Sequence, residues 1–100
     1  MSLQNLLWEG IPVVPIYTTR FEKDLKRMQK RGCDVSKIKA TIILLINEKP
    51  LDARMKDHLL KGNFKDRREC RLEPDWLLIY RFDKDKIIFE RTGTHADLFR

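Results

Sequence analysis

The stretch WLLIY, from Trp76 to Tyr80, limits the possible folds of this chain more than any other feature. It is almost entirely apolar, with the turn signal Glu73-Pro74 before it and the polar run Asp83-Lys84-Asp85 after it. A short apolar run between turn signals is typical of a strand that is covered on both faces. The sequence therefore predicts a central strand here, with strands on either side of it.

The flanking segments supply those strands. Residues 67–72 alternate between polar Arg67, Glu69 and Arg71 and a second set containing Cys70 and Leu72, which predicts a strand with one strongly polar face. Residues 86–91 predict the last strand, and Thr92-Gly93 is expected to turn out of it. Near the start, residues 13–17 are β-branched and aromatic, and their proline favours an edge or irregular strand.

Two helices are expected between the first strand and the others. Thr19-x-x-Glu22 matches a capping box, and Gly32 ends the helix that it begins. Asp34 can cap a second helix, which ends near Asn47. The apolar residues at helical spacing are Phe21, Leu25 and Met28 in the first helix, and Val35, Ile38, Ile42 and Leu45, widened by Ile43 and Ile46, in the second. The short link predicts an antiparallel helical hairpin.

The resulting order is β-α-α-β-β-β, which predicts an α+β fold with the helical hairpin on one face of a small twisted sheet. The opposite face is expected to stay partly open. Residues 13–100 form the predicted domain, and residues 1–12 an N-terminal arm. A long loop over residues 48–65 carries His58, and we expect Leu59 and Leu60 to point inward from it.

The charge of the chain is basic and unevenly placed. Residues 17–100 carry all 21 Lys and Arg against 14 of the 15 Asp and Glu, which favours a polyanion or an acidic protein as partner, although solubility alone explains such a charge too. The two cysteines predict reduced thiols, and no zinc-ligand spacing, phosphate-binding glycine loop or nucleophile elbow is present. We therefore expect no metal and no cofactor. Without a convincing signal peptide or membrane span, we expect a cytoplasmic protein.

The residues that can carry chemistry come from several segments. They are His58, Arg67, Arg68, Arg71, Asp75, Trp76, His95 and Phe99. Imidazoles suit acid–base catalysis near neutral pH, arginines hold phosphate, and aromatic rings stack on bases. These are the parts needed to cleave RNA without a metal. Each also has a simpler interpretation, as surface histidines, a core tryptophan or a solvated basic face, so the residues alone indicate a basic α+β domain that binds RNA.

Three separated motifs add a resemblance. KDHLLKG at 56–62, EPDWLLIY at 73–80 and FERTGTHADLF at 89–99 closely resemble the YafQ-type toxins of bacterial toxin–antitoxin pairs, within the RelE/ParE superfamily. The match covers roughly residues 15–99. It implies a microbial-ribonuclease-like α+β fold and an endoribonuclease that cuts mRNA in the ribosomal A site. It also implies a small acidic antitoxin with a ribbon-helix-helix DNA-binding part, with operator DNA bound only by the toxin–antitoxin complex.

The resemblance also implies roles for individual residues. His95 is the expected general acid, and either Asp75 or His58 assists removal of the 2′-OH proton. Arg71 stands where the family usually has a histidine and is expected to stabilise the phosphorane, with Arg67 or Lys65 as weaker candidates. Trp76 and Phe99 are expected to shape the nucleotide pocket. Two alternatives stay open at this point: a gyrase-inhibiting relative on the same scaffold, and a non-catalytic domain that binds RNA or the ribosome.

Overall fold

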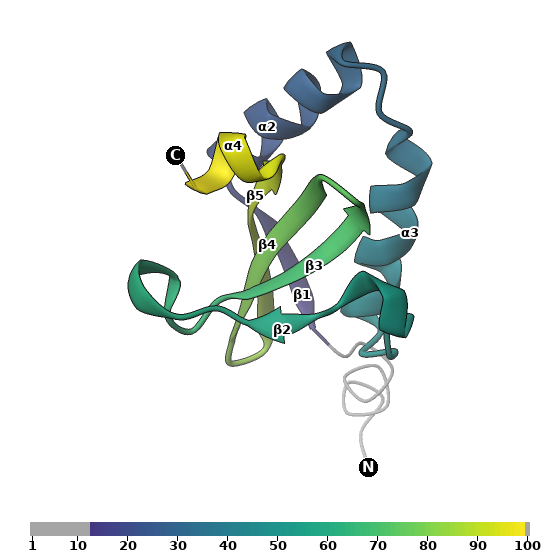
Figure 1. Cartoon of the computed structure of the whole chain (residues 1–100). Helices are drawn as coiled ribbons and strands as arrows, with labels where there is room; N and C mark the ends of the chain where they lie inside the picture. Colours follow the sequence, from purple (N-terminus) through teal and green to yellow (C-terminus); the bar gives the residue numbers. More distant parts are fainter. Residues whose placement is uncertain (1–12, 100) are drawn as a thin grey trace.

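The sheet has five strands and lies at the centre of the computed structural model, which describes residues 13–99 (Figure 1). The strand order is β1-β5-β4-β3-β2, with β1 parallel to β5 and the other neighbours antiparallel. The strands are β1 (Val14–Tyr17), β2 (His58–Leu59), β3 (Arg68–Glu73), β4 (Trp76–Asp83) and β5 (Lys86–Gly93). The predicted α+β fold is confirmed. The predicted arm at 1–12 lies outside the described residues.

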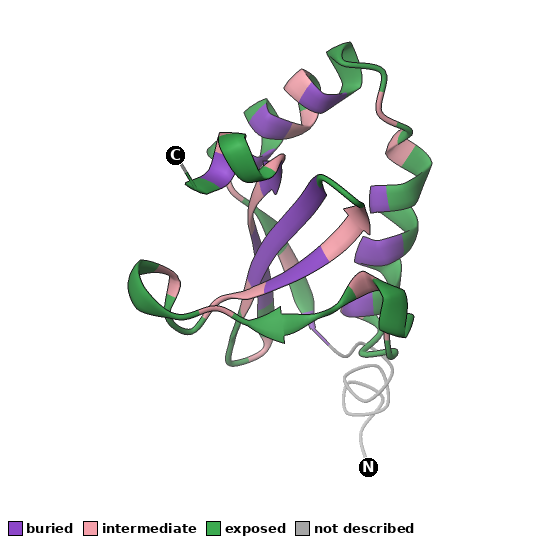
Figure 2. Cartoon of the chain, in the orientation of Figure 1, coloured by how far each residue is buried: buried purple, intermediate pink, exposed green. Residues whose placement is uncertain are grey.

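The central strand is β4, as the apolar run predicts. All five residues from Trp76 to Tyr80 are buried, because their side chains alternate between two apolar clusters on opposite faces of the sheet (Figure 2). Trp76, Leu78 and Tyr80 belong to the larger cluster, and Leu77 and Ile79 to the smaller one. The edge position of β1 agrees with the proline in that strand.

Helices α2 (Thr19–Lys30) and α3 (Val35–Ile46) cover one face of the sheet. Both contribute to the larger apolar cluster, α2 through Phe21 and Met28 and α3 through Ile38, Ile42 and Leu45. Figure 1 shows the helices diverging from their short link, so the predicted hairpin is an open one and each helix covers a different part of the sheet. Asp34 caps α3 as expected, accepting a hydrogen bond from the Ser36 amide at 3.0 Å.

The predicted cap of α2 is wrong by one residue. Thr18, not Thr19, is the N-cap, and its hydroxyl oxygen accepts a hydrogen bond from the Phe21 amide at 3.0 Å. The same hydroxyl donates to the Glu90 carbonyl, and the Thr18 amide donates to the Phe89 carbonyl. The pairing of the chain with β5 therefore continues to Thr18, and the helix starts directly after it.

The segment between α3 and β3 contains more structure than the predicted loop. It holds two short 3-10 helices, η1 (Ala53–Met55) and η2 (Gly62–Phe64), and β2 between them at the sheet edge. Leu60 packs beside the smaller apolar cluster as expected, whereas Leu59 is exposed. The expectation for Leu59 fails because neighbouring residues of an extended segment point to opposite sides.

The end of the chain folds back onto the sheet. Thr92 and Gly93 continue β5 instead of forming the expected turn, and the short helix α4 (His95–Phe99) follows. Leu98 of α4 packs on Leu77 and Ile79 and completes the smaller cluster, so it partly covers the face that α2 and α3 leave open. Both cysteines are free thiols. None of the described helices is long and apolar enough to cross a membrane.

Candidate active site

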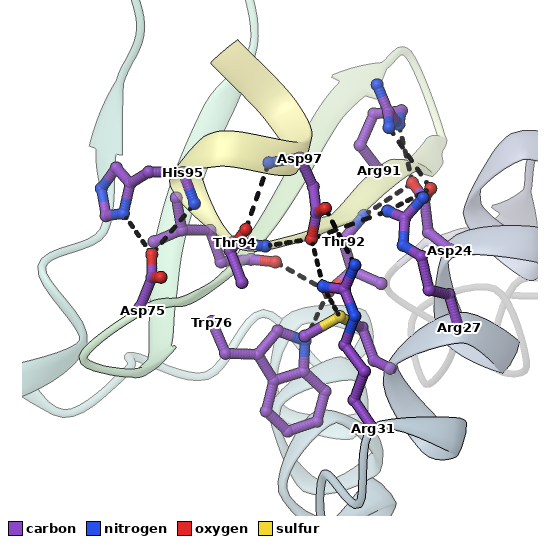
Figure 3. Close-up of polar contacts among 12 residues, drawn as sticks. Asp24, Arg27, Arg31, Asp75, Trp76, Arg91, Thr92, Thr94, His95 and Asp97 are labelled. Atoms are coloured by element: carbon purple, nitrogen blue, oxygen red, sulfur yellow. Dashed lines mark hydrogen bonds and ion pairs between the residues drawn. The ribbon is translucent and has the colours of Figure 1, made fainter. Parts of the chain in front are cut away.

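His95 and Asp75 form the central pair of the candidate site, although 20 residues separate them (Figure 3). Asp75 lies in the turn between β3 and β4, and His95 is the first residue of α4. One carboxylate oxygen, Oδ1 of Asp75, lies 2.7 Å from Nδ1 of His95 and 3.0 Å from its backbone nitrogen. Two donors from one residue thus converge on a single acceptor, which fixes both the imidazole and the start of α4.

The geometry sets the protonation of the pair. The hydrogen bonds from the backbone amide and the ring of His95 hold the pKa of Asp75 below its ordinary value, so this carboxyl is ionised near neutral pH. An ionised carboxylate can only accept, so Nδ1 of His95 carries the proton that it donates. The other ring nitrogen, Nε2, is left for a substrate. With a side chain that is 55% exposed, His95 can reach a bound molecule from this position.

A reciprocal cap forms the turn into α4. The Thr94 amide donates to Asp97 Oδ2 at 2.9 Å, and the Asp97 amide donates to Thr94 Oγ1 at 3.1 Å. Gly93 lies directly beneath, and a Cβ at that position would approach Cβ of Asp97 to 2.9 Å. The turn therefore needs glycine before the threonine. The spacing Thr-x-x-Asp in GTHAD is a capping signal that the sequence analysis passed over.

His58 lies at the edge of the sheet, on β2. Its Nδ1 is 2.6 Å from the carbonyl oxygen of Lys56, and its Nε2 is 3.8 Å from Oε1 of Glu69, its cross-strand partner on β3. Among the described residues it forms no hydrogen bond with His95 or Asp75. The structure therefore places His58 on the edge strand β2, and the pair of His95 and Asp75 at the turn between β3 and β4.

The three candidate phosphate ligands have different environments. Arg67 donates to Glu90, a residue that the shifted register of β4 and β5 leaves without a cross-strand partner, and Arg81 donates to the same carboxylate. Arg71 has no carboxylate partner within residues 13–99. It is one of the residues that line a cavity of about 570 Å³ next to the turn that carries Asp75, and Lys37, Asp52 and Glu73 line the same cavity. Lys65 is exposed just after η2.

The two candidate aromatic residues also differ. Trp76 is only 2% exposed and belongs to the larger apolar cluster, where its indole nitrogen donates to Thr92 Oγ1 at 2.9 Å. A ring buried in this way cannot stack on a base, and a contribution of Trp76 to the shape of the nucleotide pocket from within the core stays a prediction. Phe99 is partly exposed and packs against Phe64 at 5.2 Å between ring centroids, with His95 at 6.3 Å.

The sequence analysis missed the charged residues that connect this site to α2. Asp24 is buried and accepts hydrogen bonds from Arg91, from Arg27 and from the Thr92 amide (Figure 3). Arg31 donates to both carboxylate oxygens of Asp97, at 2.7 and 3.2 Å. No local signal predicts the contacts of Asp24 with Arg91 and of Arg31 with Asp97, because these partners lie more than 60 residues apart, whereas Asp24 and Arg27 are three residues apart on α2. Within the described part of the chain, no three His, Cys, Asp or Glu side chains are grouped as a metal site.

Comparison with known proteins gives consistent matches. Residues 14–100 match the sequence model of the family described as "Bacterial toxin of type II toxin-antitoxin system, YafQ". The chain is 49% identical over 84 residues to the mRNA interferase toxin YafQ of Escherichia coli K12, which covers 83% of this chain and 91% of that protein. The crystal structure of YafQ from E. coli BL21(DE3) has a TM-score of 0.84 at 45% identity, covering 88% of this chain and 99% of that one. The E. coli DinJ-YafQ toxin-antitoxin complex matches with a TM-score of 0.83 at 46% identity, covering 90% and 100%.

Proposed function

This chain belongs to the YafQ family of bacterial toxins of type II toxin–antitoxin systems, and from this membership we propose that it is an mRNA interferase. In the proposed activity it enters the ribosomal A site, cleaves the mRNA there and so inhibits translation in the cytoplasm. The E. coli relative is named an mRNA interferase, which supports the substrate class. The observation on this chain that carries the proposal is the pair formed by His95 and Asp75.

The proposed reaction is a transesterification within the RNA. The 2′-oxygen of the ribose attacks the adjacent phosphorus, the bond from phosphorus to the 5′-oxygen breaks, and the products are a 2′,3′-cyclic phosphate and a free 5′-OH. One proton leaves the 2′-OH and one proton reaches the 5′-oxygen, so side chains can complete the step without a metal ion. This chemistry requires RNA, because DNA has no 2′-hydroxyl.

His95 is the proposed general acid. The ionised carboxylate of Asp75 stabilises the charged imidazolium and orients it, so that Nε2 can deliver its proton to the 5′-oxygen. Asp75 already accepts two hydrogen bonds from His95. We therefore assign Asp75 to orientation and leave His58 as the better candidate for receiving the 2′-OH proton. Its Nδ1 faces the carbonyl oxygen of Lys56, so Nε2 is the ring nitrogen left to receive that proton, with Oε1 of Glu69 3.8 Å away.

Arg71 is the proposed ligand of the phosphate in the transition state. Among residues 13–99 its guanidinium forms no ion pair with a carboxylate, whereas Arg67 is engaged by Glu90. A guanidinium is always charged and presents paired donors that match phosphate oxygens. Because an arginine cannot exchange protons at neutral pH, Arg71 acts here through charge alone. Phe99 and Lys65 are proposed to contact the RNA at the rim of the site, Phe99 next to His95.

We also propose a cognate antitoxin as partner: a small acidic protein that binds operator DNA through a ribbon-helix-helix part, together with this chain. The similar E. coli structure contains the antitoxin DinJ. An apolar groove of about 410 Å³ between β1, α2 and α3 fits an apolar segment of such a protein, since Tyr17, Leu25 and Ile43 line it. The net charge of +6 favours an acidic partner.

One experiment tests the proposed function. Purified protein is added to a translation reaction programmed with a defined mRNA, and the 5′ ends of the mRNA are mapped, with His95→Ala as the inactive control. We expect cuts confined to the A-site codon, and no cut where that codon carries 2′-deoxyribose. Inhibited translation with intact mRNA would instead indicate a non-catalytic ribosome binder. Blocked supercoiling in a gyrase assay would indicate the gyrase-inhibiting alternative.

A further inference from the structure

Helix α2 is tied to both halves of the pair formed by His95 and Asp75 (Figure 3). Towards its C-terminal end, Arg31 holds Asp97 of α4. In its middle, Asp24 holds Arg91 and the amide of Thr92 in β5. The Thr92 hydroxyl in turn accepts from the indole of Trp76, the residue that follows Asp75. Contacts from α2 therefore reach both His95, through Asp97, and Asp75, through Thr92 and Trp76.

We propose that Arg31, acting through Asp97, is a positioning residue that holds α4 against α2 and so keeps His95 on Asp75. The inference rests on the proposed function of His95 and adds a residue from a different element to the site. Nothing in the local sequence around Arg31 indicates this role. Arg31 is the C-cap residue of α2, and the proposed catalytic imidazole lies two residues before Asp97, on α4.

A short helix needs such support. The first turn of a helix forms at a cost in conformational entropy that five residues cannot offset by themselves. Asp97 takes part in three hydrogen bonds that stabilise α4. Its carboxylate accepts from Arg31 and from the Thr94 amide, and its own amide donates to the Thr94 hydroxyl oxygen. The hydrogen bond from Arg31 is the main cause that holds the pKa of Asp97 well below its usual value, so the carboxylate is ionised in this arrangement.

Helix α2, from which Arg31 extends, is itself attached to β5 and to the core. Asp24 is 3% exposed and accepts from Arg91 Nε at 2.7 Å, so α2 and β5 are joined by a buried ion pair. Met28, one turn further along α2, is buried in the larger apolar cluster. Arg31 therefore extends from a fixed helix. An exposed ion pair adds little to global stability, and we expect its effect in the geometry of the site instead.

The test compares four variants in three measurements. The first two are the maximal rate of single-turnover cleavage of ribosome-bound mRNA and the protein concentration that gives half of that rate. The third is hydrogen exchange at the His95 amide. The variants are Arg31→Gln, Arg31→Lys, Asp97→Asn and Lys30→Gln. Lys30→Gln removes the same charge from the neighbouring exposed position of α2 and serves as the matched control. We expect Arg31→Gln and Asp97→Asn to lower the maximal rate roughly tenfold, because small displacements of a catalytic group are costly.

We further expect faster exchange of the His95 amide in both variants, an unchanged half-saturating concentration, and partial recovery of the rate in Arg31→Lys. A normal rate in Arg31→Gln would overturn the proposal, as would equal losses in Arg31→Gln and Lys30→Gln, or a slower rate with unchanged amide exchange. Full activity in His95→Ala would instead reject the proposed function. The exchange measurement would still report whether Arg31 positions α4.

Discussion

His95 and His58 are exposed to a similar extent, with side chains that are 55% and 52% accessible, but the structure holds their rings by different means. His95 donates to an ionised carboxylate from a distant turn, whereas Nδ1 of His58 lies next to a backbone carbonyl two residues earlier. A carboxylate, that of Glu69, also lies near His58, but at 3.8 Å from Nε2 it is too far for a hydrogen bond. Two histidines of similar exposure are therefore oriented by different groups, and we expect them to take different parts in the proposed reaction.

The largest expected effect comes from removing each ring. His95→Ala should lower the single-turnover rate about 10²–10⁴-fold, the range of general acid–base catalysis, because no other group is placed to protonate the 5′-oxygen. His58→Ala should cause a loss of rate about tenfold smaller than that of His95→Ala, because the His58 ring lacks an ionised orienting partner within hydrogen-bonding distance. Rates of cleavage of ribosome-bound mRNA measure both. Equal losses in the two variants would remove the distinction between the rings.

The next largest effect is expected from changing Asp75, the carboxylate that orients His95. Asp75→Asn keeps an oxygen that can accept from His95 but removes the charge that stabilises the imidazolium. We expect a loss of about 10–100-fold in the single-turnover rate, with the fold intact because Asp75 is exposed. The measurement is the cleavage rate together with the thermal midpoint. A rate within twofold of the wild type would show that the charge of Asp75 is dispensable.

Arg71 and Arg67 offer a second comparison, between an arginine proposed to bind phosphate and one that is paired with Glu90. Arg71→Gln should lower the rate about tenfold, because Arg71 forms no ion pair in the described part of the chain and is proposed to bind the phosphate. Arg67→Gln should change the rate less than about threefold, because Arg67 is engaged by Glu90. Cleavage rates at low and high salt separate the loss of a specific contact from the loss of general attraction. A larger loss in Arg67→Gln would reverse the assignment.

The smallest expected effect is the release of α4 from the sheet at low pH. Asp75 and Asp97 both have a lowered pKa in the folded protein, so their contacts stabilise α4 fully above the unfolded value of about 4 and are lost as the pH falls through the folded values. Near-neutral pH should therefore leave α4 docked, and strong acid should release it while the sheet persists. NMR signals of Leu98 and Phe99 report this release. Asp97→Asn should make the signals less sensitive to acid, and an unchanged response would contradict this origin.

Much of this fold follows from the order of residues along the chain. The apolar run of β4, the alternation in β3 and the Asp34 cap are local patterns whose physics acts over a few residues. The motifs that carry His58, Asp75 and His95 likewise indicate the family and its chemistry, as the relatives confirm for the family. The error at the α2 cap is also instructive, because the capping box with Glu22 favours Thr19, whereas the contacts of Thr18 with Phe89 and Glu90 make Thr18 the cap.

The tertiary structure decided which of these residues can act together. It placed Trp76 in the core, gave Arg71 no ion pair within residues 13–99, and joined α2 to α4 through Arg31 and Asp97. The last contact spans 66 residues, and the one between Asp24 and Arg91 spans 67. The sequence alone determined the chemical groups and the elements that carry them. Which groups meet depends on burial and distance, because the energy of a charge or a hydrogen bond is set by its surroundings in three dimensions.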